Sequence, residues 1–149
     1  MDAERTVLIV RFNHVTLFVS DLERSKAFYR ALGLVQIVDA QPRYARFRFP
    51  DSDATLSVEV LGAPPAAMLG TPPAAMPACS TLYFECETLD ATVAALQAQG
   101  LVFQLEPTDM PYLWREAHLR DPDGHELRLY SAGENRLNPP WKLPEPAVA

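Results

Sequence analysis

The chain has 149 residues, of which 48% are hydrophobic and 21% are charged. This composition is typical of a soluble globular protein and excludes a disordered chain, and the length suits one domain or two half-size units. The formal net charge of −6 argues against nucleic acid as a main partner, because phosphate binding requires clustered Lys and Arg side chains.

The N-terminal part of the chain contains an apolar run, TVLIV at 6–10, after the acidic residues Asp2 and Glu4. The run is far too short to span a bilayer, and the acidic residues do not make the basic start of a secretory signal. The two cysteines, Cys79 and Cys86, are too few for a disulfide framework and lack metal-ligand spacing. We therefore expect a cytoplasmic protein with no membrane partner.

Two stretches of the sequence align without a gap at an offset of 67 residues: NHVTLFVSDLERSKAFYRALGLV at 13–35 and STLYFECETLDATVAALQAQGLV at 80–102. In each stretch a strand with period-two alternation leads into a helix that ends at glycine. Gly33 and Gly100 suit the left-handed position just after a helix, where a Cβ would clash. The agreement indicates an internal repeat.

The two predicted helices begin at capping residues. Ser20 with Glu23 forms a capping-box pattern in the first copy, and Thr88 is the expected N-cap in the second. A core-facing stripe follows each cap. The stripes are Leu22, Ser25, Phe28, Tyr29 and Leu32 in the first helix, and Leu89, Val93 and Leu96 in the second.

Three strand candidates follow each helix, with tight reversals predicted at FPDSDA and LRDPDG. Each copy is therefore predicted to be a β-α-β-β-β unit. The strand candidates are 35–40, 43–50 and 54–62 in the first copy, and 101–106, 112–120 and 125–131 in the second.

Proline-rich segments separate and follow the two copies. The Pro/Ala/Met-rich stretch cannot continue a sheet and is predicted to be a linker or flap, and the tail with NPPWKLPEP is predicted to be extended with little secondary structure. The predicted divisions are an N-terminal extension at 1–11, the first unit at 12–62, the linker at 63–79, the second unit at 80–131 and the tail at 132–149, all within one domain.

The duplicated unit, with NHVTLFVSDLERSKAFYRALGL near the start and LRDPDGHELRLY near the end, resembles the vicinal oxygen chelate superfamily. That group includes glyoxalase I, bleomycin-resistance proteins, fosfomycin-resistance transferases and extradiol dioxygenases. The resemblance covers about residues 12–131. It implies an α+β fold in which curved mixed sheets surround a cleft, a small-molecule ligand and often a homodimer.

In metal-dependent members, the resemblance implies that ligands come from three positions, which are His14, its repeat counterpart Thr81 and Arg128 in this chain. The third position usually carries Glu, so only His14 remains as a ligand. A guanidinium repels a cation: at about 4 Å and an effective dielectric constant of about 20, two unit charges interact by roughly 4 kcal/mol, and a divalent ion feels about double. Zinc normally takes three or four protein ligands. We therefore expect no metal cofactor at the standard site.

Strand alternation predicts which side chains share the face of His14. Glu116 and His118 are expected to face the same way as Arg128 and Tyr130, whereas His125 in the turn is expected to serve only the hairpin. The candidate ligand-binding residues on this concave surface are His14, Glu59, Tyr83, Glu85, Trp114, Glu116, His118, Arg128 and Tyr130, with Phe18 and Tyr112 as further apolar walls.

Plainer interpretations stay open for several of these residues. His14 is equally explained as a hydrogen-bonded residue on a sheet face, and Glu59 as a solvated residue at a sheet edge. Arg128 is also explained by an ion pair with Glu59, Glu85 or Glu116. The first functional hypothesis is nevertheless a metal-independent binder, in which the planar fork of Arg128 holds a carboxylate or phenolate on a partly aromatic molecule.

Two enzymatic hypotheses remain beside the binder. One is a lyase, isomerase or dioxygenase that holds Zn²⁺, Mn²⁺ or Fe²⁺ with displaced ligands, namely His14 and Glu59 with Glu85 or His118. The other is a metal-free enzyme that uses His118 or His14 as a general base, with a carboxylate orienting the imidazole.

Overall fold

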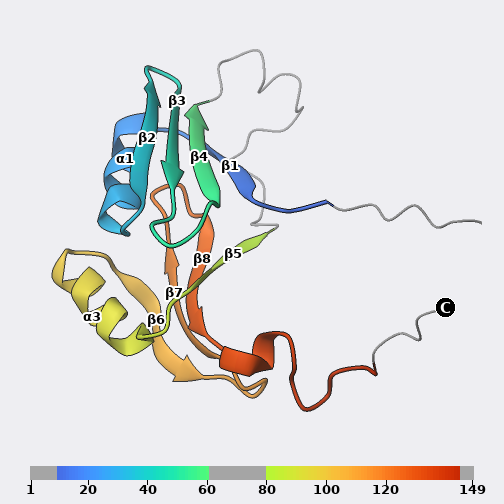
Figure 1. Ribbon diagram of the computed structural model, residues 1–149. Coiled ribbons are helices and arrows are strands. Elements are labelled where there is room, and N and C mark those ends of the chain that lie inside the picture. The colour runs from blue at the N-terminus through green and yellow to red at the C-terminus, as the bar shows by residue number, and fades with distance from the viewer. Residues whose placement is uncertain (1–9, 61–79, 145–149) are drawn as a thin grey trace, which may run out of the picture. The chain divides into compact units, whose positions relative to one another are not determined.

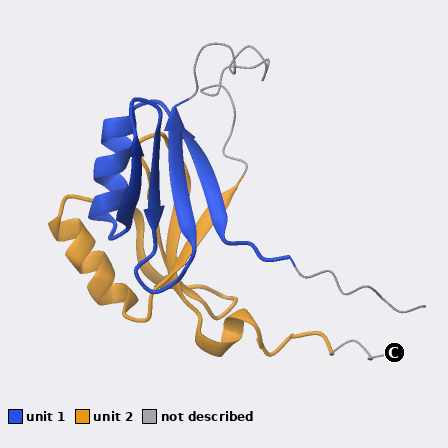
Figure 2. Cartoon of the chain, turned by 45° about the horizontal axis from the view of Figure 1, so that its top comes forward, with its two compact units in different colours: residues 1–61 blue, residues 62–149 orange. Residues whose placement is uncertain are grey.

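The computed structural model describes residues 10–60 and 80–144. The chain divides into two compact units, residues 1–61 and 62–149 (Figure 2). Within the described residues, each unit consists of a four-stranded mixed sheet and one α-helix (Figure 1). The fold is therefore α+β with two tandem β-α-β-β-β units, as predicted. The predicted linker at 63–79 and most of the N-terminal extension lie outside the described residues.

Unit 1 has the strand order β1-β4-β3-β2. Strand β1 runs parallel to β4, and the other neighbours are antiparallel. Its core lies between the helix and the sheet, where Tyr29, Phe47 and Leu56 are completely buried. The elements are β1 (His14–Val19), α1 (Leu22–Ala31), β2 (Val35–Ala40), β3 (Tyr44–Arg48) and β4 (Thr55–Val60).

Unit 2 repeats this topology with the strand order β5-β8-β7-β6. The predicted stripe of its helix is confirmed, because Leu89, Val93 and Leu96 are all buried. They pack on the sheet face that carries the buried Ala117 and Leu119. The elements are β5 (Thr81–Glu85), α3 (Leu89–Ala98), β6 (Phe103–Asp109), β7 (Arg115–Arg120) and β8 (Glu126–Ser131), followed by the short 3₁₀ helix η2 (Gly133–Arg136).

The helix ends match the predictions with one correction. Gly33 and Gly100 have φ angles of +108° and +98°, as the predicted left-handed position requires. Thr88 is the N-cap of α3, although its side chain makes no capping bond. The prediction of Ser20 as the cap of α1 was wrong: Asp21 is the N-cap and accepts a 3.1 Å hydrogen bond from Arg24 N. An ionised carboxylate at this position also interacts favourably with the positive end of the helix dipole.

The buried face of α1 includes a lysine that the apolar pattern did not predict. Lys26 is only 3% exposed, and its ammonium group donates to Glu23 at 2.8 Å and to Asp39 at 3.1 Å. Two carboxylates thus compensate the buried charge. Phe28 and Leu32 of the predicted stripe are only partly buried.

The tail differs from its predicted extended form, because η2 forms directly after β8. Trp114 Nε1 donates to Asn135 O at 3.4 Å, so η2 is bonded to the segment before β7. Trp141 further along is 57% exposed.

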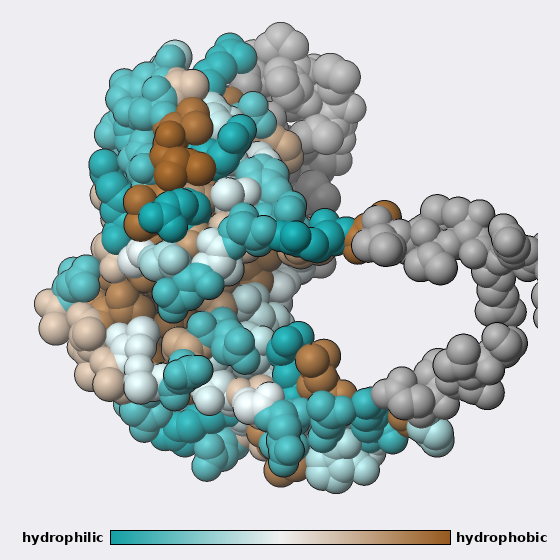
Figure 3. Space-filling view, viewed as in Figure 1, coloured by the Kyte–Doolittle hydropathy of each residue, from teal (hydrophilic) through white to brown (hydrophobic). Residues whose placement is uncertain are grey.

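Apolar side chains also remain exposed on β2 of unit 1, where Val35 and Ile37 are 40% and 48% exposed (Figure 3). Among the described residues, no helix has the length and apolar character needed to cross a membrane.

Candidate functional site

One face of the unit 2 sheet brings most of the predicted site residues together. In the antiparallel pairing of β7 with β8, Glu116 lies opposite Tyr130 and His118 lies opposite Arg128. In the parallel pairing of β5 with β8, Tyr83 lies beside Arg128. The intervening residues point toward α3 and form the core, so these five side chains occupy the opposite face, as alternation predicted.

Glu116 is the centre of this face and is completely buried. One carboxylate oxygen accepts a 2.6 Å hydrogen bond from the Tyr112 hydroxyl, and the other accepts a 2.8 Å bond from His118 Nε2. Arg128 Nη1 lies 3.7 Å from that second oxygen, which makes an ion pair without a hydrogen bond. A buried carboxylate needs such partners, because its desolvation is otherwise very costly.

Tyr112 acts as a donor to Glu116. Burial raises the pKa of the Tyr112 phenol to about 12, and the hydrogen bond to the carboxylate acts in the same direction. The phenol therefore keeps its proton throughout the physiological range.

Arg128 is held at one end and has free hydrogen-bonding capacity at the other. Its Nη1 donates to the Tyr83 hydroxyl at 2.8 Å. Its Nε is buried and has no hydrogen-bond acceptor within the described parts of the chain. Because the Tyr83 oxygen accepts from arginine, the hydroxyl proton of Tyr83 is directed toward another acceptor. Both groups can therefore donate to an anion bound beside them.

The Tyr83 ring lies 5.5 Å from the guanidinium carbon of Arg128 and belongs to a group of packed aromatic rings. Trp114 stacks on Tyr130 with ring centroids 4.7 Å apart, and Tyr83 contacts both rings edge-on at 5.7 and 5.6 Å. Tyr83 and Tyr112 remain 41% and 40% exposed, so they offer apolar surface next to a cation. We call the set the Arg128 cluster; it consists of Tyr83, Tyr112, Trp114, Glu116, His118, Arg128 and Tyr130.

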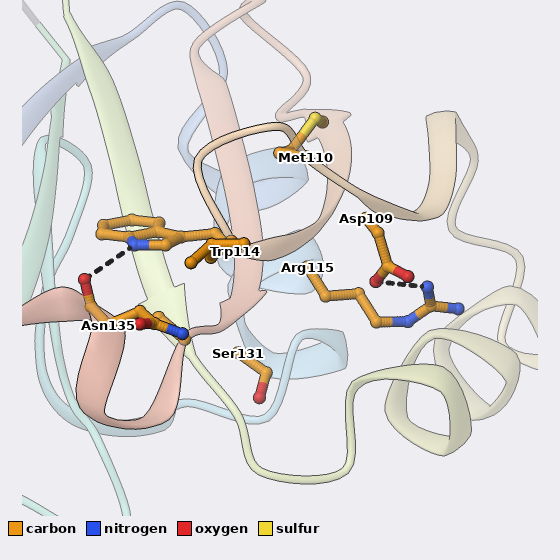
Figure 4. A pocket seen from close by; sticks show the side chains of 8 residues that line it. Asp109, Met110, Trp114, Arg115, Ser131 and Asn135 are labelled. Atoms are coloured by element: carbon orange, nitrogen blue, oxygen red, sulfur yellow. Dashed lines mark hydrogen bonds and ion pairs between the residues drawn. The ribbon is translucent and has the colours of Figure 1, made fainter. Parts of the chain in front are cut away.

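A hollow of about 430 Å³ adjoins this cluster at Trp114 (Figure 4). Trp114 is the one predicted site residue in its lining. Arg115 in the hollow is already paired with Asp90 and Asp109, at 2.8 and 2.9 Å. Strand alternation missed the hollow because strand ends (Asp109, Arg115 and Ser131) meet there with a turn and η2, and the turn and η2 have no side-chain period of two. Its lining is Asp109, Met110, Leu113, Trp114, Arg115, Ser131, Ala132 and Asn135.

His14 lies on the sheet of unit 1 and has hydroxyl partners at both ring nitrogens. Nδ1 is 2.6 Å from Thr55 Oγ1, and Nε2 is 3.2 Å from Thr16 Oγ1 and 3.4 Å from Ser57 Oγ. These contacts match the plainer interpretation of His14 as a hydrogen-bonded residue on a sheet face.

The register separates Glu59 from His14. His14 pairs with Thr55, whereas Glu59 pairs with Phe18, four residues further along the strands. At about 3.3 Å per residue this is roughly 13 Å, too far for two ligands of one ion. Glu85 belongs to unit 2, where it pairs with Tyr130 on the face of the Arg128 cluster.

The residues at the standard metal positions do not fit a divalent cation. Thr81 supplies only a hydroxyl, Arg128 supplies a positive charge, and His14 is already bonded to hydroxyl groups. Over residues 10–60 and 80–144, no group of three or more His, Cys, Asp or Glu side chains is arranged to hold a metal ion. The chemistry of this donor set therefore supports no step through a metal.

The two units carry different chemistry at equivalent register positions. In unit 1 Arg46 lies opposite Ser57, as His118 lies opposite Arg128 in unit 2. Arg46 Nε donates to the Tyr44 hydroxyl at 2.9 Å, and Tyr44 is hydrogen-bonded to Ser57. The register position of the buried Glu116 in unit 2 is thus occupied by Tyr44 in unit 1.

The sequence matches the family model described as "Glyoxalase/Bleomycin resistance protein/Dioxygenase superfamily" over residues 11–129. No curated protein matches it. A glyoxalase/bleomycin resistance protein/dioxygenase from Nocardioides has a similar structure, with a TM-score of 0.70, 23% identity and coverage of 93% of each chain. TnmS3, an antibiotic binding protein from Streptomyces sp. CB03234, gives a TM-score of 0.67 and 23% identity, with 85% of this chain and 99% of that one covered. At these identities the likeness shows the fold.

Proposed function

The chain belongs to the Glyoxalase/Bleomycin resistance protein/Dioxygenase superfamily, and from this premise we propose that it binds a small, partly aromatic molecule bearing a carboxylate or phenolate. The proposed site is the Arg128 cluster in unit 2, and binding proceeds without the standard metal site. The observation that carries the proposal is the buried, unpartnered Nε of Arg128 beside half-exposed aromatic rings.

The charges of the cluster favour an anionic ligand. Glu116 obtains its hydrogen bonds from Tyr112 and His118, and its 3.7 Å separation from Arg128 leaves the guanidinium fork free to bond elsewhere. Guanidinium matches carboxylate geometry with two parallel hydrogen bonds. A bound anion would also satisfy Arg128 Nε, whose burial without an acceptor costs about 1–3 kcal/mol.

The aromatic side chains favour a planar ligand. Tyr83 and Tyr112 expose about two-fifths of their surface, and aromatic rings stack or meet edge-on with a gain of about 0.5–1.5 kcal/mol beyond area burial. An antibiotic-binding protein shares this fold, which supports a binding role for the chain without itself naming a ligand.

A pair of probes that differ only in charge tests the proposal. The chain has two tryptophans, so Trp141→Phe leaves Trp114 as the sole indole reporter in the cluster. We expect 2-naphthoate to bind this variant and change Trp114 emission, and 2-naphthamide to bind at least about 10-fold more weakly by calorimetry. Because charge-assisted hydrogen bonds are worth about 1.5–3 kcal/mol, Arg128→Gln should weaken naphthoate binding about 10- to 100-fold.

The control is Arg120→Gln. Arg120 is a solvent-exposed arginine at the end of β7 that pairs with Glu126 of β8. This variant should bind naphthoate with wild-type affinity. Equal affinities for naphthoate and naphthamide, or equal losses from Arg128→Gln and Arg120→Gln, would contradict the proposal.

Family membership also supports a homodimer in the cytoplasm as an expectation. The exposed Val35 and Ile37 on β2 are consistent with subunit contact, since burial of aliphatic surface drives association. We expect light scattering after gel filtration to give twice the 16.6 kDa chain mass. A single-chain mass at micromolar concentration would overturn this expectation.

A further inference from the structure

We infer that the hollow beside Trp114 is a second part of the ligand site, which takes an uncharged, apolar end of the molecule held at Arg128. The inference rests on the proposed function, because the anionic group of the ligand must first be bound at the Arg128 cluster. It narrows the ligand class to an elongated aromatic acid that carries a short aliphatic chain at the end opposite its carboxylate.

The hollow has the size and the lining of a small-molecule pocket. Its volume of about 430 Å³ lies within the range of about 300–1,000 Å³ that such pockets occupy. The lining contains two neutral polar side chains, Ser131 and Asn135 (Figure 4). Its apolar surface comes from Met110, Leu113, Trp114 and Ala132. A pocket of this composition binds an apolar group and leaves a few polar atoms to orient it.

The charged groups of the lining already compensate one another. Arg115 Nη1 donates to Asp109 at 2.9 Å, and its Nε and Nη2 donate to the two carboxylate oxygens of Asp90 at 2.9 and 2.8 Å. This guanidinium therefore has two carboxylate partners, whereas Arg128 has a buried Nε without an acceptor in the described part of the chain. An anionic group is thus directed to Arg128, and an uncharged group is favoured in the hollow.

Leu113 lines the hollow in an unusual backbone conformation. Its φ of +69° makes it the one non-glycine residue with a positive φ over residues 10–60 and 80–144, and a side chain with a Cβ is strained there. Leu113 N donates to Met110 O at 3.0 Å, and Met110 N donates to Trp114 O at 2.7 Å, which closes the turn. Leu113 nevertheless remains 48% exposed. The turn therefore presents an apolar side chain that folding does not bury, and an apolar ligand group would cover it.

An aromatic surface connects Arg128 with the hollow. Along β8, Ser131 lies three residues beyond Arg128, or about 10 Å at the rise of a strand. Tyr130 lies between them, and its ring stacks on Trp114 with centroids 4.7 Å apart. Trp114 also lines the hollow. A planar ring system that lies along this surface with its carboxylate at Arg128 therefore directs its far substituent toward the hollow.

Part of the hollow lies outside the region that the chain shares with its family. The family match ends at residue 129, whereas Ser131, Ala132 and Asn135 follow it in the sequence. The backbone of Asn135 in η2 accepts the 3.4 Å hydrogen bond from Trp114 Nε1, which holds this wall against the rest of unit 2. The ligand preference of the hollow is therefore a property of this chain and not of the shared fold.

Two probes that differ only in an apolar chain test the inference. The propyl derivative, 6-propyl-2-naphthoate, carries its chain at the far end of the rings from the carboxylate of 2-naphthoate. One buried methylene group is worth about fourfold in affinity, so we expect the propyl compound to bind the wild-type chain at least about 10-fold more tightly than 2-naphthoate by calorimetry. Nuclear Overhauser effects between the propyl protons and the Met110 methyl group should place the chain in the hollow.

Leu113→Gly removes one apolar wall of the hollow. Glycine adopts a positive φ without strain, so this variant should keep a urea midpoint close to that of wild type. It should bind 2-naphthoate within about twofold of wild type, and the gain from the propyl group should fall below about threefold. The matched control is Leu143→Gly, which removes another exposed leucine from outside the lining. It should keep the whole gain.

The two levels of proposal fail differently. Binding of 2-naphthoate with no gain from the propyl group would overturn the role of the hollow and leave the proposed function standing. Failure of both probes to bind would remove both proposals. Equal losses of affinity for the two probes in Leu113→Gly, or the same reduced gain in Leu113→Gly and Leu143→Gly, would also overturn the role of the hollow.

Discussion

Glu116 combines complete burial with three polar neighbours, and this combination decides what the surrounding side chains can do. Tyr112 and His118 hydrogen-bond its two oxygens, so Arg128 contributes charge from 3.7 Å and keeps its own donors. A direct arginine–glutamate fork would have left no cation for a ligand. The buried Glu116 thus balances the charge of Arg128 without accepting a hydrogen bond from it.

Removal of one donor should expose the cost of this buried charge. We expect Tyr112→Phe to lower the free energy of unfolding by about 1–3 kcal/mol, because Glu116 loses a hydrogen bond where water cannot replace it. Urea denaturation measures the change. Tyr83→Phe is the control, since it leaves both bonds to Glu116 intact and should cost less. Equal losses in the two variants would show that Tyr112 does not support the carboxylate.

Individual residues also mark where sequence patterns stop being informative. Period-two alternation placed Glu116, His118 and Arg128 on one face, because the pleat of a strand fixes that period. It could not give the bond from Tyr112, which lies before the start of β7 at Arg115. Nor could it give the burial of Lys26 on α1, where Asp39 of β2 accepts a hydrogen bond from the ammonium group.

The DPDGH turn between β7 and β8 is stabilised from within. Asp121 is buried, and its carboxylate accepts from the backbone N–H groups of Asp123 and His125 and contacts His125 Nδ1 at 2.7 Å. The hydrogen bond to Asp121 raises the pKa of His125 above its ordinary value of 6.5. The predicted role of His125 in the hairpin is confirmed.

This turn should make stability depend on pH. Because the pKa of His125 is raised in the folded state, its interaction with Asp121 contributes fully to the free energy of unfolding below the ordinary pKa of 6.5. That contribution is lost as the pH rises through the higher folded-state pKa. Urea midpoints of wild type and His125→Asn should therefore differ most below pH 6.5 and converge as the pH rises above the folded-state pKa of His125. A difference that grows with pH would contradict this sign.

The first helix offers a test of the corrected cap. Asp21→Ala removes the side-chain bond to Arg24 N and should cost about 0.5–2 kcal/mol in unfolding free energy. Thr88→Ala is the matched control in the second helix, where the N-cap side chain makes no capping bond, and it should cost less. Equal costs would indicate that the Asp21 bond contributes nothing. The capping-box pattern favoured Ser20 because Glu23 follows three residues later, but Asp21 is also a favoured cap residue and is the one that forms the cap.

At the scale of the whole chain, the internal repeat was the most informative signal, because caps, glycine stops and strand periods agreed at one offset. The α+β architecture and the order of elements followed from it. The register did not, and it was register that placed Glu59 beside Phe18 and away from His14. Sequence patterns give the faces of strands, whereas the alignment of neighbouring strands depends on packing and turns.

Metal removal tests the chain as a whole. We expect dialysis against EDTA to leave both the melting temperature and the 2-naphthoate affinity unchanged, because Thr81 and Arg128 occupy positions that would have to bind the ion. Elemental analysis before and after dialysis checks the metal content. A stoichiometric metal whose loss lowers the melting temperature or the affinity would contradict the proposed metal-free site.

The contrast between Tyr44 with Arg46 in one copy and Glu116 with His118 in the other has a consequence for how such a protein can diversify. Each copy packs its own sheet against its own helix. Mutations that change the ligand preference of unit 2 should therefore leave the hydrogen bonds among Tyr44, Arg46 and Ser57 of unit 1 in place. A combinatorial library restricted to positions 83, 112 and 114 would explore new ligand preferences on a scaffold whose other half stays as it is.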